Sequence, residues 1–135
     1  MIDRGRAEDR QDHFDNRVYS LIALAKKRAH ESACRYRMGA VIAAGSRVLA
    51  AHSNIYRNSP LVDFRHSTFH AEEAALRRVR KAEGCVIYVA RVNYAGVAMM
   101  ARPCQRCEAR LREAGVTAAC YTIDAKSIGK MHFGR

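Results

Sequence analysis

Apolar residues recur at helical spacing near the start of the chain, and shorter strand-like runs follow them. The helical pattern covers residues 13–32, in which apolar side chains return every three or four positions. The runs 38–44 and 47–52 are short, apolar and separated by a Gly-Ser turn, which predicts a β-hairpin. The polar stretch 53–68 is expected to be a long loop, and loops of that length often line sites.

The second half of the chain alternates between helical and strand patterns. Helices are expected from 70 to about 83 and from 103 to about 114, each followed by a glycine that suits a helix C-terminus. Apolar runs at 85–92 and 116–123 predict strands, which should be parallel because a strand–helix–strand unit in one sheet forms a right-handed crossover. The order of elements predicts an α/β fold, a three-layer α/β/α sandwich on a mixed sheet of four to five strands.

The composition indicates one domain. The chain has 135 residues, enough for a substantial core. We expect 1–12 to be a loose lead-in and 13–135 to form the domain. No apolar run is long enough to span a membrane, and 1–17 lacks the apolar centre of a signal peptide. Five cysteines, an odd number, suit a reducing cytosol better than a disulfide framework. These features predict a cytoplasmic protein with no membrane partner.

The chain is strongly basic. It has 24 lysines and arginines against 13 acidic residues, a net charge of +11. Such an excess attracts polyanions and phosphorylated substrates. The basic residues are spread along the whole chain, however, which is typical of solvated faces. From charge alone, we therefore favour solvated basic faces over direct nucleic-acid binding.

Candidate chemistry is concentrated in two short motifs, HAE and, further along the chain, PCQRC. In them His70, Cys104 and Cys107 would supply three zinc ligands and leave the fourth position to water, as in catalytic sites. Glu72 follows a ligand closely enough to move protons at that water. Pro103 suits the first position of a helix, whose positive end favours thiolates. Two helix starts are therefore expected to converge on one Zn²⁺.

Other kinds of site use the same residue types. A CxxC pair also occurs in zinc ribbons and in thioredoxin-like redox sites. A zinc ribbon needs a second pair, and the remaining cysteines are isolated: Cys34, Cys85 and Cys120. We expect these three to be buried small apolar residues. A redox site leaves His70 and Glu72 unexplained, so the catalytic zinc site is the favoured hypothesis.

Taken together, these residues resemble the cytidine deaminase superfamily over roughly 18–123. The resemblance rests on the hairpin 38–51, on Asn54 after it, on TFHAEEAAL, on PCQRC and on EAGV leading to Tyr121. HxE followed by PCxxC is the signature of zinc-dependent nucleobase deaminases. The HAE triplet and a parallel final strand are most similar to the deoxycytidylate, tRNA-adenosine and AID/APOBEC branches. The resemblance implies a cytidine deaminase-like fold and a zinc cofactor.

The resemblance also implies roles for particular residues. The histidine and the two cysteines would bind zinc, and Glu72 would shuttle protons. Asn54 would hydrogen-bond the sugar of the substrate, or else is a turn residue after a strand. The backbone of Ala71 would contact the base.

Three further residues carry two interpretations each. Arg65 and His66, on the loop before the site, either meet a phosphate or are part of a solvated loop. Tyr121 either belongs to a specificity loop over 121–124 beside the pocket or is an ordinary strand residue.

The end of the chain departs from the family pattern. Relatives add another helix and strand after the 121 region, and only 124–135 follows here. Either 128–133 forms a short edge strand through a tight turn, or the sheet has four strands and an open edge that invites a homo-oligomer.

The favoured function is hydrolytic deamination of a cytosine-bearing nucleoside or nucleotide, with deoxycytidylate preferred. Zinc-bound hydroxide would attack C4 and Glu72 would act as the proton shuttle. One alternative is deamination of cytosine or adenine in single-stranded DNA or RNA, which the net charge of +11 supports and the 7% aromatic content does not. The other is a catalytically silent, zinc-stabilised binding module, which would have no use for Glu72.

Overall fold

The computed structural model describes residues 14–56 and 68–134 of the chain. The sequence-based expectations for residues 1–12, Arg65 and His66 lie outside these ranges. No described helix combines the length and the apolar character needed to cross a bilayer.

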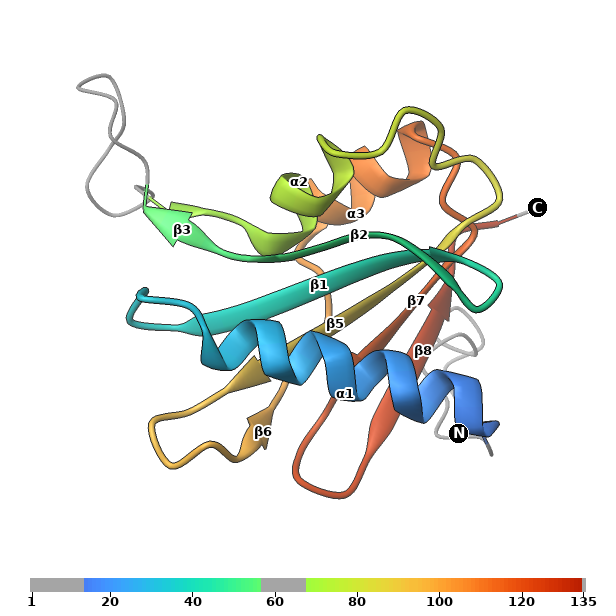
Figure 1. Ribbon diagram of the computed structural model, residues 1–135. Coiled ribbons are helices and arrows are strands. Elements are labelled where there is room, and N and C mark those ends of the chain that lie inside the picture. The colour runs from blue at the N-terminus through green and yellow to red at the C-terminus, as the bar shows by residue number, and fades with distance from the viewer. Residues whose placement is uncertain (1–13, 57–67, 135) are drawn as a thin grey trace, which may run out of the picture.

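A mixed sheet of six strands forms the centre of the fold (Figure 1). Its order is β2-β1-β5-β7-β8, with the short β6 paired to β5. β5 and β7 are parallel, as expected, and the other pairs are antiparallel. The strand bounds are β1 Arg37–Ala44, β2 Arg47–Ser53, β5 Val86–Val92, β6 Ala98–Met99, β7 Ala118–Thr122 and β8 Ile128–His132.

Helices cover both faces of this sheet. Helix α1 (Asn16–His30) lies across one face, and α2 (Ala71–Leu76) and α3 (Gln105–Glu113) lie on the other. Alternate residues of each strand therefore enter two separate cores. In β1, for example, Val41 packs under α1 while Ile42 faces the α2 and α3 side. The three-layer α/β/α sandwich predicted from the sequence is confirmed.

Helix α1 begins and packs as its sequence predicts. The side chain of Asp15 caps it by accepting a hydrogen bond from Val18 N at 3.1 Å. The helix approaches β1 so closely that a Cβ on Gly39 would lie 2.2 Å from Ala25 O. Any side chain at position 39 would therefore push α1 off the sheet.

Helix α2 is shorter than expected. It ends at Leu76 instead of reaching Glu83. The next residues include Arg77, Arg78, Arg80 and Lys81, which would place like charges three and four positions apart on one helix. The chain leaves the helix through tighter turns, with Arg78 N bonding Ala75 O and Val79 N bonding Leu76 O.

The last strand resolves the alternative left open by the sequence. β8 pairs antiparallel with β7, so the edge strand exists. A Cβ on Gly129 would lie 2.6 Å from the ring of Tyr121, so a glycine is needed for this strand to pack on β7. The four-stranded sheet that would have favoured an oligomer is not the sheet observed, and a homo-oligomer stays a prediction.

Two features were not expected. β5 continues through a turn into the short β6, which pairs with it before the chain reaches the PCQRC motif. At the two ends of the expected loop 53–68, β3 (Ile55–Tyr56) and β4 (Thr68–Phe69) pair as a separate two-stranded sheet.

Candidate active site

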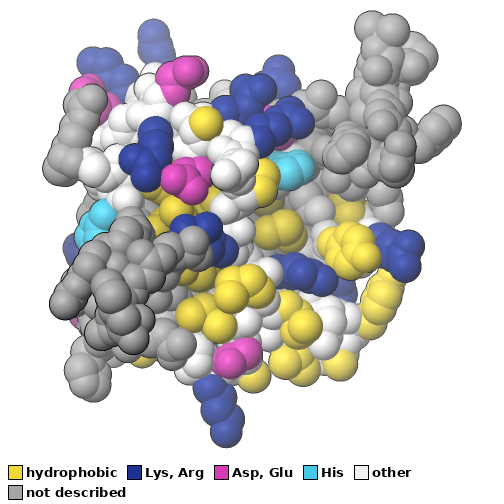
Figure 2. Space-filling view, turned by 180° about the vertical axis from the view of Figure 1, so that it is seen from behind, with side chains coloured by type: hydrophobic (Ala, Val, Ile, Leu, Met, Phe, Trp, Pro, Cys, Tyr) yellow, Lys and Arg dark blue, Asp and Glu magenta, His cyan; other side chains and the backbone are white. Residues whose placement is uncertain are grey.

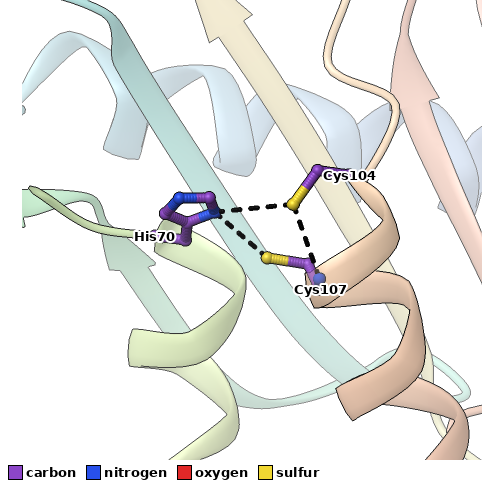
Figure 3. Close-up of side chains that lie close together, drawn as sticks. All are labelled: His70, Cys104 and Cys107. Carbon is purple, nitrogen blue, oxygen red and sulfur yellow. Dashed lines mark hydrogen bonds between the residues drawn. The ribbon is translucent and has the colours of Figure 1, made fainter. Parts of the chain in front are cut away.

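The three candidate ligands meet where two helices begin (Figure 3). His70 is the N-cap residue of α2, and Cys104 is the N-cap residue of α3. Cys107 follows in the first turn of α3. Pro103 therefore precedes the cap, two places before the first helical position predicted for it, because the Cys104 side chain itself accepts a hydrogen bond from Cys107 N.

The distances between the ligand atoms fit a zinc ion. All three lie within 4.8 Å of one another. His70 Nδ1 lies 3.1 Å from Cys107 Sγ and 3.9 Å from Cys104 Sγ. Tetrahedral bonds of normal zinc length place nitrogen and sulfur about 3.6 Å apart, between the two observed values. The residues present are therefore positioned to form a zinc site, as predicted. A redox pair would not account for the histidine at this distance.

The environment of Cys107 also suits a cation. Its side chain is 1% exposed. Burial raises the pKa of the Cys107 thiol, and the nearby Glu72 carboxylate raises it further. A thiolate at this position needs a positive charge beside it, which a divalent metal ion provides.

Glu72 is a buried carboxylate beside the ligands. It is 3% exposed, and its Oε1 atom has no hydrogen-bond partner among the described residues. Burial raises the pKa of Glu72 to about 7, against a smaller opposing effect of its own backbone N–H. A carboxyl group that exchanges protons near neutral pH is suited to general acid–base chemistry. An unsatisfied buried oxygen also indicates that a ligand or water completes the site.

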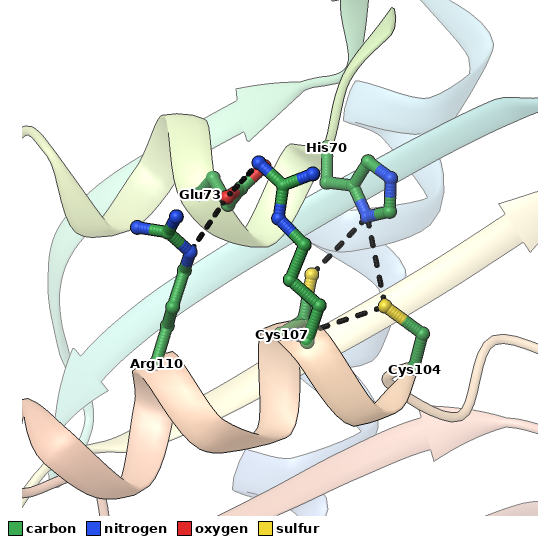
Figure 4. A network of polar contacts seen from close by, with 6 residues as sticks. His70, Glu73, Cys104, Cys107 and Arg110 are labelled. Carbon is green, nitrogen blue, oxygen red and sulfur yellow. Dashed lines mark hydrogen bonds and ion pairs between the residues drawn. The ribbon is translucent and has the colours of Figure 1, made fainter. Parts of the chain in front are cut away.

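Glu73 joins the two ligand-bearing helices (Figure 4). Its carboxylate is 6% exposed and lies 3.1 Å from Arg106 Nη2 and 2.9 Å from Arg110 Nε. Both arginines belong to α3, whereas Glu73 belongs to α2. These ion pairs hold the start of α3 against α2 and so fix the two cysteines relative to the histidine.

Removing both arginines should destabilise the domain. Breaking a buried ion pair costs about 3–5 kcal/mol. Solvent screens the two half-exposed arginines, however, so we expect Arg106→Ala with Arg110→Ala to lower the free energy of unfolding by about 2 kcal/mol. Urea denaturation measures this value.

Two further variants identify the cause of that loss. Adding Glu73→Gln to the double variant should recover part of the stability, because the stranded charge is gone. Glu108→Ala removes the exposed pair with Arg112 and should cost about 0.5 kcal/mol or less. A double variant no less stable than Glu108→Ala would show that the Glu73 ion pairs do not hold the helices.

A pocket of about 500 Å³ opens over the site. Its lining includes His70, Glu72 and Cys104, so two of the three candidate ligands and the carboxylate face one space. The sequence analysis missed the other polar and large side chains that line it: Tyr36, Met38, Arg91, Met100 and Arg102.

A larger hollow, of about 740 Å³, lies elsewhere, between the ends of α2 and α3 and Phe133. It contains none of the candidate ligands and is lined by charges of both signs. Because the chemistry lies in the smaller pocket, we assign the active site there.

Asn54 is buried, and its side chain is hydrogen-bonded to the segment that leads into β1. Its Oδ1 accepts hydrogen bonds from Ser32 Oγ at 2.7 Å and Met38 N at 2.9 Å. Its Nδ2 donates to Tyr36 O at 2.6 Å. Asn54 is not a lining residue of the pocket, but it fixes two residues that are. Contact with a substrate sugar stays a prediction.

We expect Asn54→Ala to cost about 2 kcal/mol of unfolding free energy, because it strands buried hydrogen-bonding groups. The variant should also raise KM, since Tyr36 and Met38 lose their support. Ser32→Ala, which removes only one hydroxyl of the network, should have about half the effect on stability. Urea denaturation and steady-state kinetics test both effects. An Asn54→Ala variant as stable as the unmodified protein would refute this role.

The remaining predicted residues lie as follows. Ala71 is the first residue of α2 and is fully buried, and its backbone contact with a base stays a prediction. Tyr121 is a strand residue of β7, 2% exposed and packed in the core against Gly129. This position fits the strand interpretation, and contact of Tyr121 with a substrate stays a prediction. The other three cysteines, Cys34, Cys85 and Cys120, are buried and free, as expected.

Known proteins share this fold and motif. The cytidine and deoxycytidylate deaminase zinc-binding region matches residues 12–123. The chain therefore belongs to this deaminase family. A search of curated proteins gives no match.

Solved structures support the fold assignment. The dCMP deaminase of cyanophage S-TIM5 in complex with dCMP and dUMP is similar at a TM-score of 0.60 and 19% identity, covering 81% of this chain and 83% of that one. Cytidine deaminase from Burkholderia pseudomallei is similar at a TM-score of 0.66 and 17% identity, covering 85% of this chain and 91% of that one. A tRNA:A34 deaminase is similar at a TM-score of 0.50 and 21% identity, covering 76% of this chain and 74% of that one. At these identities the similarity establishes the cytidine deaminase-like fold.

Proposed function

We propose that this protein is a zinc-dependent hydrolytic deaminase that converts a cytosine-bearing nucleotide, preferably deoxycytidylate, to its uracil form. The observation that carries the proposal is the position of Glu72. Its buried, unpartnered carboxylate lines the same pocket as His70 and Cys104. A site that only stabilised the fold would not need this carboxylate, which is our reason for not preferring a silent binding module.

The residues divide the work of the reaction. His70, Cys104 and Cys107 would hold Zn²⁺, which when bound lowers the pKa of water toward neutrality. The overall reaction adds water at C4 of cytosine and breaks the bond from C4 to the exocyclic nitrogen, which leaves as ammonia. Glu72 Oε1 could accept one proton of the attacking water and give it to the ring nitrogen beside C4. It could then take the second proton of that water and give it to the amine, which leaves as ammonia. A carboxyl group with a pKa of about 7 can act in both directions at neutral pH.

The surface favours a small substrate over a polymer. Figure 2 shows the side of the sheet opposite α1, where the lysine and arginine side chains of the described residues are scattered among hydrophobic ones. A protein that follows a single strand combines a basic groove with stacking aromatics. The net charge of +11 keeps a polynucleotide substrate as the second candidate.

Ammonia release by the purified, zinc-loaded protein tests the proposal. The substrates to compare are deoxycytidylate, cytidine, deoxycytidine, adenosine, guanine and a mixed single-stranded oligonucleotide. Turnover of deoxycytidylate would support the favoured function. Activity on the oligonucleotide alone would replace it with the second candidate, and no release from any substrate would refute both.

A further inference from the structure

We propose that Arg91 binds a phosphate group of the substrate and that Tyr36 holds its guanidinium in place. This inference rests on the proposed function, since it names the group by which a nucleotide would be told from a nucleoside. Neither residue belongs to the zinc motif. Both line the pocket that contains His70 and Glu72.

The sheet places Arg91 at this pocket. In β5 the residues Ile87 and Val89 face the core beneath α2 and α3, and the alternation of the strand sends Arg91 to the same side. Its pairing partner in β1 is Met38, another lining residue. The backbone at Arg91 is also fixed, because its N–H donates to Thr122 Oγ1 at 3.2 Å. A charged group on a rigid strand is well suited to define a binding site.

Tyr36 is an exposed aromatic residue whose ring contacts two guanidinium groups. Its side chain is 57% exposed. The Arg91 guanidinium lies 5.0 Å from the centre of its ring, and that of Arg35 lies 5.7 Å away. Such contacts orient an arginine without neutralising it. Asn54 Nδ2 donates a hydrogen bond to Tyr36 O and so fixes the backbone that carries the ring.

The charge of Arg91 remains available. No carboxylate in the described part of the chain lies within ion-pair distance of its guanidinium, in contrast to Arg106 and Arg110. Arg102 lines the same pocket and adds a second positive charge. A planar guanidinium binds phosphate through two parallel hydrogen bonds. Among the anions that a guanidinium binds in this way, the proposed substrate offers a phosphate, which deoxycytidylate has and deoxycytidine lacks.

Binding measurements separate this proposal from catalysis. In the zinc-loaded Glu72→Gln protein, where no turnover consumes the ligand, titration calorimetry gives Kd for deoxycytidylate, deoxycytidine and a single-stranded oligonucleotide. We expect deoxycytidylate to bind about tenfold or more tightly than deoxycytidine, as hydrogen bonds between charged groups allow. Arg91→Ala should remove most of this ratio and leave deoxycytidine binding unchanged.

Matched variants identify the mechanism. Arg91→Lys keeps the charge and loses the planar fork, so it should recover the ratio only in part. Tyr36→Phe keeps the ring and should retain more of the ratio than Tyr36→Ala, which should lower it about threefold. Arg47→Ala removes an exposed arginine at the start of β2, outside the pocket, and should change nothing.

The outcomes are distinct. A ratio that survives Arg91→Ala would overturn the proposal, and so would equal binding of nucleotide and nucleoside by the unmodified pocket. If only the oligonucleotide binds, Arg91→Ala must weaken it and lower its salt dependence by about one phosphate contact, or the proposal fails. Failure to bind any phosphorylated ligand also overturns it. The proposed function is judged separately, by ammonia release from the protein that retains Glu72.

Discussion

Replacing Glu72 with glutamine is expected to abolish ammonia release while the zinc site and the fold persist. Glutamine has the same size and can donate hydrogen bonds, but it cannot take up and return a proton. General acid–base catalysis contributes about a hundredfold to ten-thousandfold to a rate, and here one carboxylate would serve several transfers. The loss in kcat should therefore be at least a thousandfold.

Glu72→Gln should not destabilise the domain, because burial already disfavours the charged carboxylate, as its raised pKa shows. Metal analysis would verify that the variant still binds zinc, and thermal unfolding would verify that its fold is intact. Glu113→Gln, which changes an exposed carboxylate at the end of α3, is the control and should retain full activity. A Glu72→Gln protein that keeps a tenth of its turnover would show that another group carries the proton.

Local sequence patterns were sufficient for most of the fold. The spacing of apolar residues defined α1, and an apolar run with a Gly-Ser turn defined the β1–β2 hairpin. The ligand set was equally accessible, because His70, Cys104 and Cys107 stand in two compact motifs at helix starts. In each case the information lies within a few neighbouring residues, where steric and hydrogen-bonding preferences act directly.

The features that sequence analysis missed depend on contacts between distant segments. Arg91 and Tyr36 meet only because β1 and β5 pair in one register, which no local pattern specifies. One signal was present, since Arg91 interrupts an otherwise apolar strand on the face that carries the site. The Glu73 ion pairs likewise depend on how α2 and α3 pack. Asn54 was recognised as special, but its hydrogen bonds to three residues before and at the start of β1 became visible only in the structure.

Replacing Cys107 with serine is expected to remove zinc and to lower thermal stability. The hydroxyl is a poor zinc ligand, and the site would be left with His70 and Cys104. A ligand that binds only the folded state stabilises it by about 4 kcal/mol when its free concentration is a thousand times Kd. For a domain of this size, that corresponds to a melting temperature higher by on the order of 10–20 °C. Addition of a strong chelator should produce a similar fall in the unmodified protein.

Cys120→Ser provides the matched control, because Cys120 is also 1% exposed but lies in β7 away from the ligands. Both variants bury a hydroxyl, so both lose some stability for that reason alone. Only Cys120→Ser should still bind one zinc per chain and respond to the chelator. The difference between the two chelator responses isolates the contribution of the metal. If Cys107→Ser kept stoichiometric zinc, the ligand assignment would be wrong and the pocket would need another explanation.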